Sequence, residues 1–267
     1  TIPACEGNVT YTYTYTDCEG NHHDWVYTYN IEREDFTMPV NPTPQVIACA
    51  AELAEPTLPI ITDNCDNVLT PTGPVISTIP ACEGNVTYTY TYTDCEGNTH
   101  DWVYTYTIER EDFTMPVNPT PQVIACAAEL AAPTLPVITD NCDNVLTPTG
   151  PVISTTTVCE SNVTYTYTYT DCEGNTHDWV YTYTIEREDF TMPNIGSSMV
   201  ACIASATEPV PPSVSDNCGN AITPSAAVTG GTYDGCEGTR TYTFSYTDCE
   251  GNTHDWVYTY TIEREPF

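Results

Sequence analysis

The segment Val86–Glu109 reads VTYTYTYTDCEGNTHDWVYTYTIE and carries the clearest structural signal in the chain. On both sides of its CEGN turn, apolar or aromatic residues alternate with polar ones, and this period of two is typical of β-strands. Two such runs around a Gly-Asn turn predict an antiparallel hairpin. Its aromatic face must be buried, because exposing it would leave a large apolar patch. The side chains expected in the core are those of Tyr88, Tyr90, Trp102, Tyr104 and Tyr106.

The hairpin sequence recurs along the whole chain with a period of 77 residues. Cysteines follow the same spacing, as at Cys5, Cys82, Cys159 and Cys236. A period longer than about 50 residues indicates an array of small domains rather than a solenoid. The expected organisation is the C-terminal half of a repeat domain at 1–35, complete domains at 36–112 and 113–189, and a complete domain with a divergent first half at 190–267.

The first half of each unit is less regular and rich in proline. Short apolar segments such as Gln45–Ala48 stand between Pro and Gly residues, which predicts short strands, several of them at sheet edges. About six or seven strands in a 77-residue unit, with no helical period, are typical of an immunoglobulin-like sandwich. The predicted fold class is all-β, with tandem immunoglobulin-like β-sandwich domains.

Composition excludes several classes of function. The 267 residues include 37 Asp or Glu and 5 Lys or Arg, for a formal net charge of −32. Nucleic-acid binding depends on Lys and Arg that neutralise phosphate, so no nucleic-acid partner is expected. No apolar run approaches the ~20 residues of a membrane span, so membrane insertion is not expected either. A disordered chain could also carry this charge, but 40% of the residues are hydrophobic, which is too much apolar surface to leave unpacked.

Each complete unit carries four cysteines, and their spacing matches no paired zinc-binding pattern. An even, repeated set is typical of disulfides and of an extracellular, oxidising compartment. Cys82 and Cys95 flank a strand of roughly 30 Å, whereas a disulfide spans at most ~7 Å between Cα atoms. They therefore cannot pair, and two of the three pairings within a unit remain open.

We favour the pairing that joins the two loops expected at the same end of an immunoglobulin-like unit, DNCDN and DCEGN. Each domain would then hold two disulfides. Because Cys5 and Cys18 match Cys82 and Cys95, we expect both to be unpaired within this chain. The expected pairs are Cys65–Cys95, Cys49–Cys82, Cys142–Cys172, Cys126–Cys159, Cys218–Cys249 and Cys202–Cys236.

Two motifs carry a family resemblance. ITDNC occurs at Ile61–Cys65 and Ile138–Cys142, with VSDNC at Val214–Cys218, and the hairpin motif TDCEGN…HDWVYTY occurs in all four copies with small changes. The chain resembles the hyalin-repeat (HYR-like) domains of the four-cysteine kind, which form long arrays in large bacterial surface proteins and adhesins. The resemblance implies an immunoglobulin-like fold, secretion, and a stalk, filament or adhesive role. It implies no catalytic residues.

A cluster of acidic residues is a candidate calcium site, because calcium prefers oxygen ligands. The alternative is that the Asp-Asn and Gly-Asn pairs form turns and that the remaining acids keep the chain soluble. No other cofactor is expected. The candidate ligands are Asp63, Asp66, Asp94, Asp101, Glu109, Glu111 and Asp112.

Catalysis is not expected, and the chain is predicted not to be an enzyme. His100 stands next to Asp101, but neighbours on a strand point to opposite faces and so would not form a relay. A structural hydrogen bond of the histidine at the start of the hairpin strand is the simpler interpretation.

The sequence predicts a structural extracellular array that forms a stalk, fibre or adhesin filament of a bacterial cell surface. The alternative is a multivalent module that binds a surface glycan or protein, with avidity from repetition. The expected partners are neighbouring repeats of the same protein, with lateral self-association as a further possibility. The DNCDN and DCEGN loops hardly vary among the copies, which favours a structural role over binding.

Overall fold

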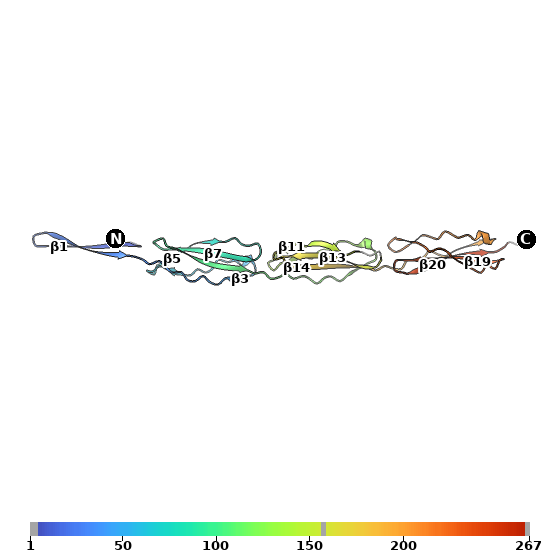
Figure 1. The fold of residues 1–267 in the computed structure, drawn as a ribbon, viewed down its shortest axis with the longest axis horizontal. Helices are drawn as coiled ribbons and strands as arrows, with labels where there is room; N and C mark the ends of the chain where they lie inside the picture. The colour runs from blue at the N-terminus through green and yellow to red at the C-terminus, as the bar shows by residue number, and fades with distance from the viewer. Residues whose placement is uncertain (1–4, 156–158, 265–267) are drawn as a thin grey trace. The chain divides into compact units, whose positions relative to one another are not determined.

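A computed structural model of the chain describes residues 5–155 and 159–264 and shows an all-β protein of tandem immunoglobulin-like sandwiches. Each complete repeat has the same order of elements, with two long strands in its second half (Figure 1). No helix of the described residues is long and apolar enough to cross a membrane.

The repeat that begins at Phe36 shows the arrangement. It has a four-stranded sheet in the order β3-β8-β7-β6 and a separate pair, β4-β5. Strand β3 runs parallel to β8, whereas β6 and β7, and β7 and β8, are antiparallel. Its elements are β3 (Gln45–Ile47), the short 3-10 helix η1 (Ala50–Glu52), β4 (Ile61–Thr62), β5 (Val68–Leu69), β6 (Thr72–Ile76), β7 (Gly84–Thr93) and β8 (Thr99–Ile108).

The next two repeats have equivalent sheets, in the orders β12-β13-β14-β9 and β15-β20-β19-β18, with the pairs β10-β11 and β16-β17. The second complete repeat contains β9 (Gln122–Ile124), η2 (Ala127–Glu129), β10 (Ile138–Thr139), β11 (Val145–Leu146), β12 (Thr149–Ile153), β13 (Ser161–Thr170) and β14 (Thr176–Ile185). The third contains β15 (Gly196–Val200), η3 (Ile203–Ser205), β16 (Val214–Ser215), β17 (Ala221–Ile222), β18 (Val228–Gly230), β19 (Gly238–Thr247) and β20 (Thr253–Ile262).

The predicted hairpin is confirmed, and its aromatic face is buried. Tyr90 lies opposite Trp102 in the register of β7 and β8, and the two side chains are 2% and 5% exposed. Tyr88 and Tyr106 are buried as expected. Tyr104 is half-buried at the edge of this core, where its hydroxyl donates a hydrogen bond to Oε1 of Gln45 at 2.8 Å.

The proline-rich first half of the repeat covers this face and satisfies its hydroxyl groups. Phe36, Ile47 and Ile61 are buried in the same core. The hydroxyl of Tyr92 donates to the carbonyl of Pro59 at 3.0 Å, and that of Tyr106 donates to the carbonyl of Ala54 at 2.9 Å. Because Pro has no N–H and this segment is irregular, its carbonyls are free of a sheet ladder and can accept these bonds.

A glycine is required where β6 bends beside β7. Gly73 has φ +111°, and a Cβ at this position would lie 2.8 Å from the carbonyl oxygen of Thr89. The register of β6 against β7 shifts between Thr72 and Val75. A residue with a side chain would be strained there and would push β6 away from β7.

The first 31 residues contain the same hairpin, β1 (Gly7–Thr16) and β2 (His22–Ile31), but its aromatic face is exposed. Tyr15 is 64% exposed, whereas the equivalent Tyr92 is fully buried. Trp25 is 51% exposed, against 5% for Trp102. No proline-rich half-unit packs on this hairpin among the described residues, so strand sequence alone sets the hairpin but does not bury it.

The chain divides into two compact units that do not follow the 77-residue period. The first comprises Thr1–Thr114 together with Ile138–Leu146 and Thr170–Asn175. The second comprises Met115–Val137, Thr147–Tyr169 and Thr176–Phe267. Two loops of the second complete repeat thus group with the repeat that precedes it.

The duplicated hairpin gives an internal control for the core. We expect Tyr92→Ala to destabilise its repeat by about 3–5 kcal/mol, because a large buried aromatic side chain is lost. The equivalent Tyr15→Ala should change stability by less than about 0.5 kcal/mol, since its side chain is exposed. Urea unfolding followed by hydrogen exchange, resolved by peptide, measures both; equal effects would contradict the assignment of the core.

Candidate functional site: the disulfide-braced junctions

Two loops of each complete repeat share one design, an Asp and an Asn four residues apart. In the first loop, Oδ1 of Asp63 accepts the backbone N–H groups of Cys65 and Asn67, both at 2.9 Å. Nδ2 of Asn67 donates to Oδ2 of Asp63 at 2.9 Å. The second loop repeats the scheme, with Asp94 accepting from Glu96 and from Asn98. Such side-chain bonds replace a regular turn and hold the loop in one shape.

The fourth residue of these loops adopts a positive φ, the left-handed conformation. Gly97 has φ +90°, and Asp66 and Asp143 take the same conformation at +61° and +63°. The divergent repeat has Gly219 at the latter position, with φ +82°. Asp tolerates this region better than most residues, and Gly adopts it freely, so the sequence change in VSDNCGN leaves the loop intact.

The cysteines of these loops bond to the neighbouring repeat, and the predicted pairing within units is wrong. The first cysteine of a repeat bonds to the second cysteine of the next, and the third bonds to the fourth of the next. All Cα–Cα distances are 5.6–5.7 Å. The disulfides are Cys5–Cys95, Cys49–Cys142, Cys82–Cys172, Cys126–Cys218 and Cys159–Cys249.

Reach explains this pairing. Cys82 and Cys95 lie at opposite ends of β7, whose ten residues span roughly 33 Å, so each cysteine faces a different neighbour. The expectation that Cys5 is unpaired is also wrong, because it bonds to Cys95. Within the described residues Cys18, Cys65, Cys202 and Cys236 are free and exposed. The pattern that joins the first cysteine of a repeat to the second of the next, and the third to the fourth, gives these four cysteines no partner within the chain.

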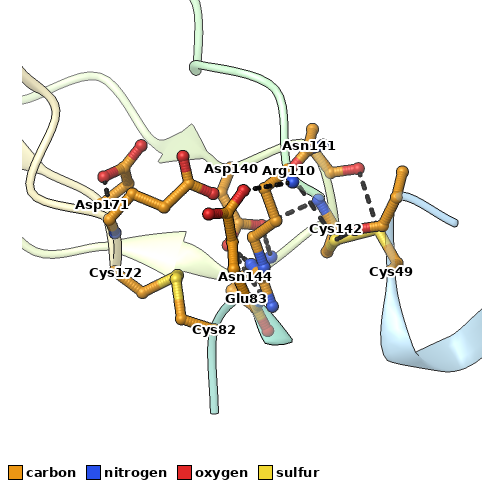
Figure 2. Close-up of polar contacts among 12 residues, drawn as sticks. Cys49, Cys82, Glu83, Arg110, Asp140, Asn141, Cys142, Asn144, Asp171 and Cys172 are labelled. Atoms are coloured by element: carbon orange, nitrogen blue, oxygen red, sulfur yellow. Dashed lines mark hydrogen bonds and ion pairs between the residues drawn. A yellow bond between two sulfur atoms is a disulfide. The ribbon is translucent and has the colours of Figure 1, made fainter. Parts of the chain in front are cut away.

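A buried ion pair lies at each junction. Nη1 of Arg110, on the segment that leaves one repeat, donates to Oδ2 of Asp140 in the DNC loop of the next at 2.6 Å. The two side chains are 10% and 7% exposed. Arg110 is also held through its backbone N–H, which donates to Oε1 of Glu83 at 2.9 Å. The ion pair lies between the two disulfides, Cys82–Cys172 and Cys49–Cys142 (Figure 2).

The same pair recurs as Arg33–Asp63 and Arg187–Asp216, both at 2.5 Å. The side-chain bond from Asn67, backbone N–H bonds and the Arg33 charge outweigh burial and lower the pKa of Asp63 to about 2. Burial opposes ionisation of Asp140, but bonds from Asn144 and Cys142 and the charge of Arg110 still hold its pKa below the usual range. These carboxylates are therefore ionised at neutral pH.

Glutamates next to the disulfides behave in the opposite way. Burial raises the pKa of Glu173, which follows Cys172, and the nearby carboxylates Glu83 and Asp171 raise it further. Glu96 and Glu250 have raised pKa values for the same reason, burial first and then a neighbouring glutamate. The junction thus holds like charges together at neutral pH, and the disulfides oppose their repulsion.

The histidine of the hairpin contacts the linker and not the neighbouring aspartate. Nε2 of His100 lies 2.9 Å from Oδ2 of Asp35, the residue just before Phe36. The ring also packs edge-on against Phe36, with centroids 4.8 Å apart. Asp101 instead accepts a hydrogen bond from the hydroxyl of Thr91 at 2.6 Å. The predicted structural role of His100 agrees with this geometry, and His254 makes the equivalent contact with Asp189.

The candidate calcium ligands do not form one oxygen cage. Asp63 and Asp94 direct their carboxylate oxygens at N–H groups of their own loops, and Asp63 also binds Arg33. Cations would compete with these donors, so both residues fit the turn interpretation and do not fit calcium. The remaining candidates lie exposed in the turn, at the hairpin or in the linker: Asp66, Asp101, Glu109, Glu111 and Asp112. Calcium binding there stays a prediction, and an unchanged melting temperature in EDTA would contradict it.

The arginine was missed as a functional residue, although the sequence contains a signal. Arg110 is the one basic residue among the eleven acids of Phe36–Asp112. A single cation that recurs at a fixed place in such an acidic repeat is expected to neutralise a specific carboxylate. The prediction that both loops lie at the same end of a repeat agrees with the structure, because Cys142 of one loop and Cys172 of the other both bond to the preceding repeat (Figure 2).

Fold and junctions define a class of protein: a tandem array of β-sandwich repeats of the extracellular type, each tied covalently to its neighbours. The model of the HYR-like domain with four cysteines matches residues 1–31, 36–108, 113–185 and 190–262. The chain therefore belongs to the HYR-like family with four cysteines.

Comparison with curated proteins finds no match for this sequence. Among solved structures, the protocadherin GammaB4 extracellular domain is 10% identical to this chain, with a TM-score of 0.31. The match covers 96% of this chain and 56% of that structure, so this chain spans little more than half of its length. A calcium-stabilised adhesin that helps an Antarctic bacterium bind ice is 16% identical, with a TM-score of 0.27, and the match covers 97% of this chain and 82% of the adhesin structure. These scores are too low to support an inference about function.

Loss of the junction arginine should weaken the loop it binds. Arg110→Ala leaves Asp140 buried without its cation, and breaking a buried pair from one side costs about 3 kcal/mol. We expect faster hydrogen exchange of the 138–146 loop and a lower urea midpoint. Arg264→Ala is the matched control, because the side-chain bond described for Arg264 is one of 3.4 Å to the carbonyl of Gly235. Equal effects of the two substitutions would contradict a role for the ion pair.

Stability should pass through a maximum at mildly acidic pH. As pH falls toward 4.5, the ordinary pKa of Glu, Glu173 takes up a proton and its repulsion from Glu83 is relieved, so stability rises. Below 3.8, the ordinary pKa of Asp, the contribution of ionised Asp63 is lost as pH falls toward its folded pKa of about 2. Melting temperatures between pH 7 and 2 test this profile. Glu173→Gln should flatten the rise, whereas a steady fall from pH 7 in both proteins would contradict it.

Proposed function

We propose that this chain is a structural segment of an extracellular surface protein and forms part of a stalk, fibre or adhesin filament of a bacterial cell that carries mechanical tension. The observation that carries the proposal is the junction: two disulfides and one buried Arg–Asp pair join each repeat to the next. Disulfides persist in oxidising compartments, so five of them favour a site outside the cytoplasm.

The use of the loops supports a structural role over ligand recognition. The DNC and DCEGN loops hardly vary among the copies, and both are occupied by the junction through Cys142 and Cys172. Loops that differed from copy to copy would favour recognition instead. The proposal is also non-enzymatic, because His100 serves the linker contact with Asp35.

The strong negative charge suits such a role. A net charge of −32 keeps neighbouring chains apart and soluble, so an array can extend outside the cell without non-specific association. The cost is repulsion within the protein, which the junction arginines and the disulfides offset locally.

Disulfide mapping and surface labelling test the proposal. Non-reduced peptides should show Cys49 linked to Cys142, and the difference between Glu55 and Ala132 distinguishes the two nearly identical repeats. Antibodies against the chain should label intact, unpermeabilised cells. Mostly free thiols in the native protein, or labelling that requires permeabilised cells, would refute it.

A further inference from the structure

We infer that the disulfides form covalent paths that carry tension, a first path across the repeats at 36–112 and 113–189 and a second across the repeat at 113–189, so that the array keeps its length even when one of these repeats unfolds. The inference rests on the proposed structural function and goes beyond it, because it assigns the tension to particular segments. It follows from which cysteines are joined, together with the extended backbone between them.

The first path uses the long Tyr-Thr strands. It crosses from Cys5 to Cys95, follows β7 back to Cys82, and crosses to Cys172. In the next repeat it follows β13 back to Cys159 and crosses to Cys249. The path therefore uses 13 residue steps in each of the repeats at 36–112 and 113–189, as from Cys82 to Cys95, although each of these repeats has 77 residues.

This short segment is already extended. A β-strand rises about 3.3 Å per residue and a fully stretched chain about 3.6 Å, so 13 steps can lengthen by only about 4 Å. Strand β7 also lies between β6 and β8, hydrogen-bonded on both edges, with its tyrosine face buried. Tension along the first path thus acts on the best-supported strand of the sheet.

The second path is longer and acts in reserve. It crosses from Cys49 to Cys142, follows the chain back to Cys126, and crosses to Cys218. The segment from Cys126 to Cys142 has 16 residue steps and includes η2, a 3-10 helix that rises about 2 Å per residue. Because this segment has slack, the first path becomes taut before it.

Together the two paths protect the chain against cleavage. At least two disulfides bridge every peptide bond between Cys49 and Cys218, as shown by their overlapping spans. A single backbone cut there leaves one covalent molecule. A nicked chain should migrate as one 29.4 kDa species without reductant and as fragments with it.

Force measurements on the full chain, tethered at its two ends, test the inference. In the reduced protein, each complete repeat that unfolds should release about 230 Å of contour length, the difference between 77 stretched residues and the 13-residue strand segment. In the oxidised protein, the release should be only a few Å for each of the repeats at 36–112 and 113–189. Steps of a whole repeat in the oxidised chain would overturn the inference.

Two matched double variants identify the path. The first variant, Cys82→Ser with Cys172→Ser, lacks one disulfide of the junction. Its shortest covalent route passes through Cys49 and Cys142, so the fully stretched oxidised chain should be longer by on the order of 130 Å. The second variant, Cys49→Ser with Cys142→Ser, lacks the other disulfide of the same junction but keeps the shortest route, so its stretched length should not change. Equal lengths for the two variants would overturn the assignment.

The stretched length depends on covalent links and not on folding, so a variant that folds poorly still gives a decisive result once peptide mapping has verified its remaining disulfides. The test is also separate from that of the proposed function. If the oxidised chain stays short under force but the protein is absent from the cell surface, only the proposed function is refuted. If the protein is found at the cell surface but its oxidised repeats lengthen fully, only the covalent paths are refuted.

Discussion

The structure depends on the mismatch between a long strand and a short bond. Strand β7 holds its flanking cysteines roughly 33 Å apart, whereas a disulfide joins Cα atoms less than 7 Å apart. These two cysteines therefore cannot bond to each other. Each instead bonds to a different neighbouring repeat, Cys95 to Cys5 and Cys82 to Cys172, and these bonds make the array covalently continuous.

The ion pair and the acids of the junction are consequences of the same closeness. Bringing the DNC and DCEGN loops against the preceding repeat places Glu83 and Glu173 near each other, which raises the pKa of Glu173 through burial first and then repulsion. The chain has a net charge of −32, and Arg110 is the one Lys or Arg residue of the repeat at 36–112. It lies at this junction, where it forms an ion pair with the buried Asp140. Removing water from the pair strengthens it and also makes it costly to break.

Local sequence predicted a large part of the fold. The alternation around CEGN predicts β7 and β8 and their buried face, because a period of two places side chains on fixed sides of a strand whatever surrounds it. Tyr104 is the partial exception, since it lies at the edge of the core and its hydroxyl binds Gln45. Arg110 was missed because its partner Asp140 lies in the next repeat and local sequence does not show which carboxylate it meets, although its recurrence among acids was visible.

The long strands, the period of 77 residues, the family and the presence of disulfides were predictable from the amino-acid sequence, since these depend on residue type and spacing. The exposed Tyr15 and buried Tyr92, identical in local sequence, show that burial depends on what packs against the strand. Tertiary structure alone decided that Cys49 bonds to Cys142 and not to Cys82. Spacing excludes pairs that are too far apart, but which of the remaining sulfurs meet depends on the direction in which each repeat presents its loops to the next.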